Sequence, residues 1–194
     1  MVSPNENTDT GMAAVESTVQ TDQNNTKRFA LDEMQRLINN TSEFTFEEKQ
    51  RFEKLKTYAK SQPLSSQEFA LMLADERFLM FSLVLNKNLD GKQVSQLMTE
   101  AVLSRIEKTM VERNYLQHVA ALPNASVGVL RHIVSLSKKK LNGTIKLTYT
   151  LKNVILNSAC TKNVTGKTLN KYDYKMLRAL NNEALNAKID KFMR

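Results

Sequence analysis

Apolar residues recur at helical spacing along nearly the whole chain from residue 27 onward, and this pattern most constrains the possible fold. In segment 27–40, for example, Phe29, Met34 and Leu37 fall on one face of a helix. With 5 glycines and 3 prolines in 194 residues, the chain lacks the turn residues of a β architecture. The sequence therefore predicts a mainly α fold, a multi-helix bundle of about six or seven helices around one core.

Two Ser/Thr-x-x-Glu sequences indicate where helices begin. Thr45 precedes Glu48 by three residues, and Ser65 precedes Glu68 in the same way, so each pair can form a capping box. We expect the first of these helices to end at Pro63. The segment 78–85 is apolar on nearly every side, which predicts a central, buried helix.

The second half of the chain is predicted to form longer helices. One is expected from near Asp90 to just before Pro123, and another from an N-cap at Asn124 to a stop near Gly143. Segment 144–160 is ambiguous, and we expect a short extended piece followed by a helix from about Thr150. A polar loop over 161–168 then leads to one last helix over 170–194.

Charge divides the chain into three parts. Residues 1–26 carry four acids and no base, and their polar, aperiodic sequence predicts a disordered acidic tail. This tail either has no function or folds back on the basic half and weakens non-specific binding. Residues 27–100 carry eleven bases and eleven acids, whereas residues 101–194 carry seventeen bases and five acids. We therefore expect a helical scaffold for self-association or partner binding over 27–121 and a basic helical region over 122–194.

A run without any acidic residue, 113–172, is the most informative feature for function. Such an imbalance repels itself unless a polyanion or an acidic partner neutralises it. Nucleic acid is the commonest such partner, because each cation that meets a phosphate releases condensed counterions. The candidate binding residues are Arg131, Lys138, Lys139, Lys140, Lys146, Tyr149, Lys152, Lys162, Lys167, Lys171, Tyr172, Lys175 and Arg178.

Within this set, Lys171, Lys175 and Arg178 recur at helical spacing and could follow a phosphate backbone. Tyrosines interleave with the cations, and tyrosine can stack on unpaired bases, which slightly favours RNA or single strands. No helix-turn-helix, zinc knuckle, RRM-type or KH-type motif is present, so weak sequence specificity is expected. The Gly-Lys-Thr at 166–168 lacks the earlier glycine and the strand of a phosphate loop, although its backbone N–H groups and Lys167 could still contact a phosphate.

Nothing in the sequence supports catalysis. His118 and His132 have no partner at metal-ligand spacing, and Cys160, the single cysteine, has no activating context. The acids alternate with bases as on ordinary solvated helix faces. We expect neither an enzyme nor a metal or other cofactor.

The resulting hypothesis is a non-catalytic nucleic-acid-binding accessory or regulatory protein of a nucleoprotein, transcription or packaging complex. The alternative is a structural or assembly protein whose basic half docks on an acidic protein partner. Frequent Asn, Lys, Thr and Ile are typical of AT-rich coding genomes, as in many viruses. Without a signal-peptide pattern or an apolar run near about 18 residues, we expect a soluble, intracellular protein with no membrane association.

Overall fold

Local capping signals start helices in the computed structural model, which describes residues 29–40, 42–75, 79–107, 112–140 and 145–194. At the start of α2 (Phe46–Ser61), the Glu48 N–H donates to Thr45 Oγ1 at 3.2 Å, and the Thr45 N–H donates to the Glu48 carboxylate at 3.1 Å. Ser65 and Glu68 form the same capping box at α3 (Ser66–Ala74). Both predicted capping boxes are confirmed, and α2 ends just before Pro63.

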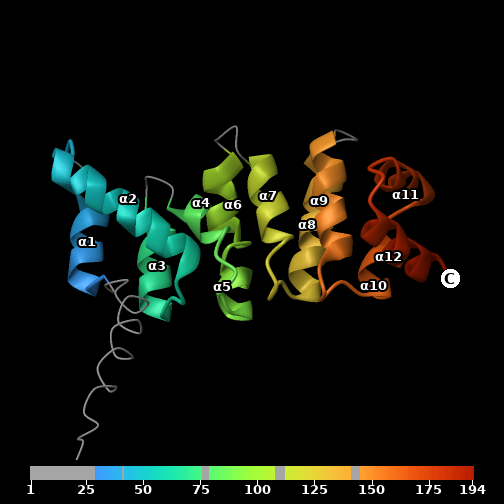
Figure 1. Cartoon of the computed structure of the whole chain (residues 1–194), viewed down its shortest axis with the longest axis horizontal. Helices are drawn as coiled ribbons and strands as arrows, with labels where there is room; N and C mark the ends of the chain where they lie inside the picture. The colour runs from blue at the N-terminus through green and yellow to red at the C-terminus, as the bar shows by residue number, and fades with distance from the viewer. Residues whose placement is uncertain (1–28, 41, 76–78, 108–111, 141–144) are drawn as a thin grey trace, which may run out of the picture. The chain divides into compact units, whose positions relative to one another are not determined.

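The chain divides into two units, residues 1–30 and 31–194, and the twelve helices of the described residues all belong to the second. Besides α2 and α3, they are α1 (Leu31–Asn39), α4 (Met80–Leu83), α5 (Gly91–Gln96), α6 (Glu100–Glu107), α7 (Glu112–Val119), α8 (Val127–Lys140), α9 (Ile145–Leu156), α10 (Lys162–Thr168), α11 (Lys171–Arg178) and α12 (Glu183–Met193) (Figure 1). The mainly α prediction is confirmed, with no strand in the described residues. The predicted acidic tail, 1–26, lies outside them.

Helices that are close in sequence also pack together. In the first half, α1 contacts α2 and α3, and both α2 and α3 contact α4 (Figure 1). In the second half, α7, α8, α11 and α12 all contact α9. The predicted roles of a scaffold over 27–121 and a basic region over 122–194 remain predictions about function.

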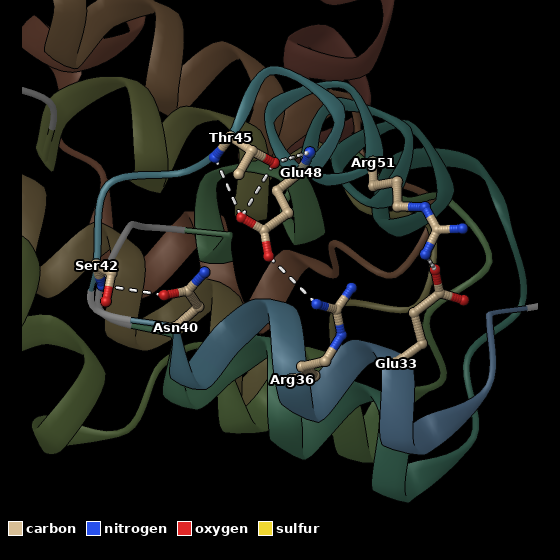
Figure 2. A network of polar contacts seen from close by, with 7 residues as sticks. All are labelled: Glu33, Arg36, Asn40, Ser42, Thr45, Glu48 and Arg51. Atoms are coloured by element: carbon tan, nitrogen blue, oxygen red, sulfur yellow. Dashed lines mark hydrogen bonds and ion pairs between the residues drawn. The ribbon is translucent and has the colours of Figure 1, made fainter.

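Polar contacts join α1 to α2 at the surface (Figure 2). Arg36 pairs with Glu48 at 3.2 Å, and Arg51 pairs with Glu33 at 2.9 Å. The hydrogen bond from the Thr45 backbone N–H, with Arg36 beside the carboxylate, lowers the pKa of Glu48. Exposed ion pairs stabilise little, so the buried Met34 of α1 contributes more to holding this helix in place.

The same arrangement of three helices occurs twice, in α2–α3–α4 and in α7–α8–α9. In each case the first and second helices contact the third, and a proline follows the first helix: Pro63 after α2 and Pro123 after α7. A buried asparagine follows the third helix, Asn86 after α4 and Asn157 after α9. This similarity is apparent from the helix contacts of the folded chain.

Each buried asparagine makes the same set of hydrogen bonds, which we call the Asn clamp. The Nδ2 group of Asn86 donates to Ala59 O and Gln62 O at the end of α2, both at 2.8 Å. Its Oδ1 atom accepts from the Asn88 N–H at 2.9 Å. The clamp therefore satisfies helix-end carbonyls that have no partner within their own helix.

Asn157 repeats these contacts in the second half. Its Nδ2 group donates to Ala120 O at 3.1 Å and Leu122 O at 2.7 Å, just beyond α7, and its Oδ1 atom accepts from the Ala159 N–H at 2.9 Å. After each clamp, two further helices follow: α5 and α6 after Asn86, and α10 and α11 after Asn157. The α5–α6 and α10–α11 pairs thus occupy corresponding places in the chain.

The predicted single helix from Asp90 to Leu122 is wrong, since the structure has α5, α6 and α7 there. A helix does begin near Asp90, as expected, and Asp90 caps it. After α5 the hydrogen bonds tighten, with the Met98 N–H donating to Ser95 O, three residues back, at 3.1 Å. The buried Tyr115 hydroxyl of α7 donates to Leu97 O at 2.8 Å, so a long-range partner stabilises a break that no glycine or proline marks.

Helix α9 begins at Ile145, so the predicted extended piece before Thr150 is wrong. Alternation of apolar residues indicated a strand, but Thr148, Leu151 and Ile155 are all buried and recur at helical spacing. Packing against α7 and α8 therefore determines the conformation of this segment and overrides the strand-like alternation of its sequence.

Three further predictions differ from the structure. The predicted last helix is divided into α11 and α12, because Asn181 takes a positive φ of 50° and Asn182 caps α12 through the Leu185 N–H at 2.9 Å. The predicted N-cap Asn124 instead donates to Leu89 O at 2.7 Å. The predicted central helix over 78–85 is reduced to the short, buried α4, and its first residue, Phe78, lies outside the described residues. Gly143, the predicted helix stop, also lies outside them.

Replacing either clamp asparagine should lower the free energy of unfolding. We expect Asn157→Ala and Asn86→Ala each to cost about 1–3 kcal/mol, because two buried carbonyl oxygens would be left without their donor. Asn88→Ala is the matched control: its exposed side chain donates to Ser61 O at 2.7 Å, and its removal should cost about 0.5 kcal/mol. Urea unfolding followed by circular dichroism measures all three, and equal losses of stability would contradict the clamp.

Candidate nucleic-acid interface

Helices α10 and α11 carry most of the exposed cations of the candidate set. Val164 and Thr165 bury one side of α10, while Tyr174 and Leu177 bury one side of α11. Asn170 caps α11 through the Asp173 N–H at 3.0 Å, and the Asp173 carboxylate accepts from the Asn170 N–H at 2.8 Å. The buried faces leave the opposite sides of both helices exposed.

Lys138 of α8 anchors the junction between these two helices. Its Nζ atom donates to Thr168 O at the end of α10 and to Asp173 Oδ2 at the start of α11, both at 2.7 Å. The Asp173 side chain is only 7% exposed, so Lys138 neutralises a buried carboxylate. The ammonium group of this candidate residue therefore has a structural role inside the fold.

Four lysines of the candidate set are exposed and carry no such contact. Lys162 and Lys167 lie on α10, and Lys171 and Lys175 lie one turn apart on α11. Across the described part of the chain, none of the four has a carboxylate within ion-pair distance. We call Lys162, Lys167, Lys171 and Lys175 the lysine cluster.

The other cations with described side chains differ in their contacts. Arg178 pairs with Asp190 of α12, so its charge is partly balanced. The Lys152 Nζ atom lies 5.5 Å from the centre of the Tyr149 ring. Arg131 is exposed on α8.

Lys139 and Lys140 lie in the last turn of α8, next to the anchoring Lys138, and Lys146 lies in the first turn of α9. Their side chains are not among those that the structure describes. The backbone of Lys139 and Lys140 nevertheless follows Lys138 directly, and Lys138 contacts the α10–α11 junction. Their roles as binding residues remain predictions.

The tyrosines interleaved with the basic run divide into buried and exposed residues. Tyr115 is fully buried and Tyr174 is 8% exposed, and burial raises the pKa of both hydroxyl groups. Tyr149 is 40% exposed and Tyr172 is 65% exposed. Only the last two therefore present a ring surface on which a base could stack.

The Gly-Lys-Thr sequence forms the end of α10, and the predicted polar loop is wrong. The Thr165 and Leu169 N–H groups donate to carbonyls four residues back, at 3.2 Å and 2.9 Å. Backbone N–H groups committed to a helix cannot also surround a phosphate. Any phosphate contact here therefore comes from the Lys167 side chain.

Burial shifts the pKa of two of the side chains weighed for catalysis, Cys160 and His118. Burial raises the pKa of the Cys160 thiol to about 11, which keeps the thiol protonated at neutral pH. Burial also lowers the pKa of His118. In the described ranges, no three His, Cys, Asp or Glu side chains gather closely enough to hold a metal ion. None of the helices described there has the length and apolar character needed to cross a membrane.

Comparisons of this chain with models of protein families, with curated proteins and with solved structures gave no match. Neither a fold family nor an activity can therefore be assigned by similarity. The function has to be inferred from the exposed cations and from the contacts that position them.

Removing the anchoring charge should destabilise the fold. We expect Lys138→Met to lower the free energy of unfolding by about 1–3 kcal/mol, because it leaves the buried Asp173 carboxylate without its cation. Arg178→Met is the matched control, since it breaks an exposed ion pair with Asp190 and should cost less than about 1 kcal/mol. Urea unfolding at neutral pH gives both values, and an unchanged stability of Lys138→Met would exclude the anchor.

Gly166→Ala should raise the free energy of unfolding by about 0.5–1 kcal/mol, because alanine favours the helix and restricts the unfolded chain. An added Cβ would meet the Lys162 side chain at 3.8 Å, an ordinary contact distance. Thermal and urea unfolding measure the change. A clear decrease in stability would indicate that this glycine serves a loop conformation.

Proposed function

We propose that this protein is a non-catalytic nucleic-acid-binding factor that contacts the phosphate backbone through the lysine cluster. It acts as an accessory or regulatory component of a nucleoprotein, transcription or packaging complex. The observation that carries the proposal is that all four lysines are exposed and, within the described residues, without an acidic partner. Such cations bind a polyanion with the release of its condensed counterions.

The corresponding helices of the first half support a functional origin of this charge. Residues 91–107, which contain α5 and α6, carry two bases and two acids. Residues 162–178, which contain α10 and α11, carry five bases and one acid. The excess of lysine therefore belongs to the later pair of helices and is absent from the pair at the matching place in the chain order. A ligand with many negative charges explains it.

Binding should depend on side-chain charge more than on base sequence. The Asn170–Asp173 capping box takes up two backbone N–H groups at the N-terminus of α11, and the Asp173 carboxylate there already interacts with the helix dipole. Lysine ammonium groups contact phosphates as point charges, and contacts to the phosphate backbone carry no sequence information. Weak sequence preference and a strong dependence on salt are therefore expected.

A charge-matched pair of variants tests the proposal. We expect a variant with all four cluster lysines changed to Gln to bind nucleic acid roughly 10- to 100-fold more weakly at low salt. The slope of log affinity against log salt should become shallower by about 3, since each phosphate that no longer meets a lysine accounts for nearly one. Fluorescence anisotropy with labelled RNA and DNA across a salt series measures both quantities.

The control removes the same charge elsewhere. Lys49, Lys54, Lys60 and Lys87 are exposed in the first half of the chain, and their change to Gln should leave affinity and slope nearly unchanged. An equal reduction of affinity in both variants would show that only net charge matters. If the wild-type protein binds no nucleic acid at low salt, the proposal is wrong, and an acidic protein becomes the ligand to seek.

A further inference from the structure

We infer that the exposed face of α11 is a platform for the unpaired bases of a single-stranded nucleic acid, with Tyr172 as the stacking residue beside Lys175. This inference rests on the proposed function, because it assumes that the lysine cluster meets nucleic acid. It adds a ligand class, single strands, and one residue that contacts the bases.

The first support is the position of Tyr172 on the helix. Lys175 lies three residues after Tyr172 and four after Lys171, so its side chain neighbours each of these two along the helix surface. Tyr174 and Leu177, on the other side of α11, are buried. The ring of Tyr172 is therefore on the exposed side of α11, next to Lys175.

The second support is the exposure of this ring. Tyr172 is 65% exposed, and among the described residues it makes no aromatic contact and no hydrogen bond through its hydroxyl group. An exposed aromatic ring near a cation leaves its face available to a planar ligand. Recognition of a ligand that combines a planar ring with a phosphate accounts for the tyrosine and the lysines at once.

Single strands fit this chemistry better than a duplex does. In a duplex the bases stack on one another, and a tyrosine ring on the protein surface cannot reach their faces. An unpaired base can stack on the phenol while its neighbouring phosphates meet Lys171 and Lys175. The stacking contribution would be tolerant of sequence because every base has an aromatic face.

Tyr149, the other exposed tyrosine of the basic run, is less suitable as the platform. It is 40% exposed, and the Lys152 ammonium group already lies 5.5 Å from its ring centre. This cation interacts with one face of the ring, so a base would have to displace it or use the other face. Tyr172 carries no such contact in the described structure.

The test compares two substitutions of one residue. We expect Tyr172→Ala to weaken binding of a labelled oligouridine or oligothymidine roughly 5- to 100-fold, the range found when one base–aromatic stack is removed. Duplex affinity should change less than about twofold, and the salt slope should not change because no charge is removed. Tyr172→Phe retains the ring and should bind single strands nearly as well as the wild type.

Phe46→Ala is the matched control, since Phe46 is an exposed aromatic residue on α2, 75% exposed and far from the basic run in the sequence. It should leave binding of both ligands unchanged. Urea unfolding of each variant checks that the exposed substitutions preserve stability. Crosslinking to a 5-iodouridine-containing strand, followed by mass spectrometry, should identify the peptide that contains Tyr172.

The outcomes separate this inference from the proposed function. Binding by the wild type that needs the lysine cluster but is unchanged in Tyr172→Ala would overturn the stacking platform alone. An equal reduction of single-strand and duplex affinity in Tyr172→Ala would overturn it as well. No binding of any nucleic acid by the wild type would overturn both proposals together.

Discussion

Short helices leave many backbone carbonyls without a partner, and this fold depends on side chains that reach them from distant parts of the chain. A helix leaves the last four carbonyls unsatisfied however short it is, so a fold of many short helices has many such groups. The two Asn clamps satisfy those at the ends of α2 and α7. Burying these carbonyls without donors would be costly, and the clamps make close packing of the helix ends possible.

Several cations serve the same need. Arg105 of α6 donates to Leu73 O at 2.7 Å and also to Asp75 O, which closes the end of α3. Lys188 of α12 donates to Leu156 O at 2.9 Å, at the end of α9. Lys138 donates both to a helix-end carbonyl, Thr168 O, and to the buried Asp173 carboxylate. Among the described residues, some cations therefore complete the fold, whereas others remain exposed at its surface.

The difference between these two kinds of basic residue bears directly on function. The sum of positive charges alone cannot distinguish a binding surface from a structural one, because Lys138 and the lysine cluster look alike in the sequence. The structure separates them by their partners, and it separates Tyr172 from Tyr174 by exposure. What remains exposed on α10 and α11 is a small set of ammonium groups with one aromatic ring, a combination suited to a flexible polyanion that also carries planar bases.

The sequence by itself determined the features that depend on residues within one helical turn: the mainly α class, the capping boxes at Thr45 and Ser65, the helix start near Asp90, and the uneven distribution of charge. Only the tertiary structure decided where the helix predicted from near Asp90 breaks after α5 and which candidate residues are engaged. The break after α5 has its partner in Tyr115, 18 residues away, and the partner of Lys138 is 35 residues away. Capping and periodicity act between neighbours and can be read from local sequence, whereas burial and long-range pairing exist only once the helices have packed together.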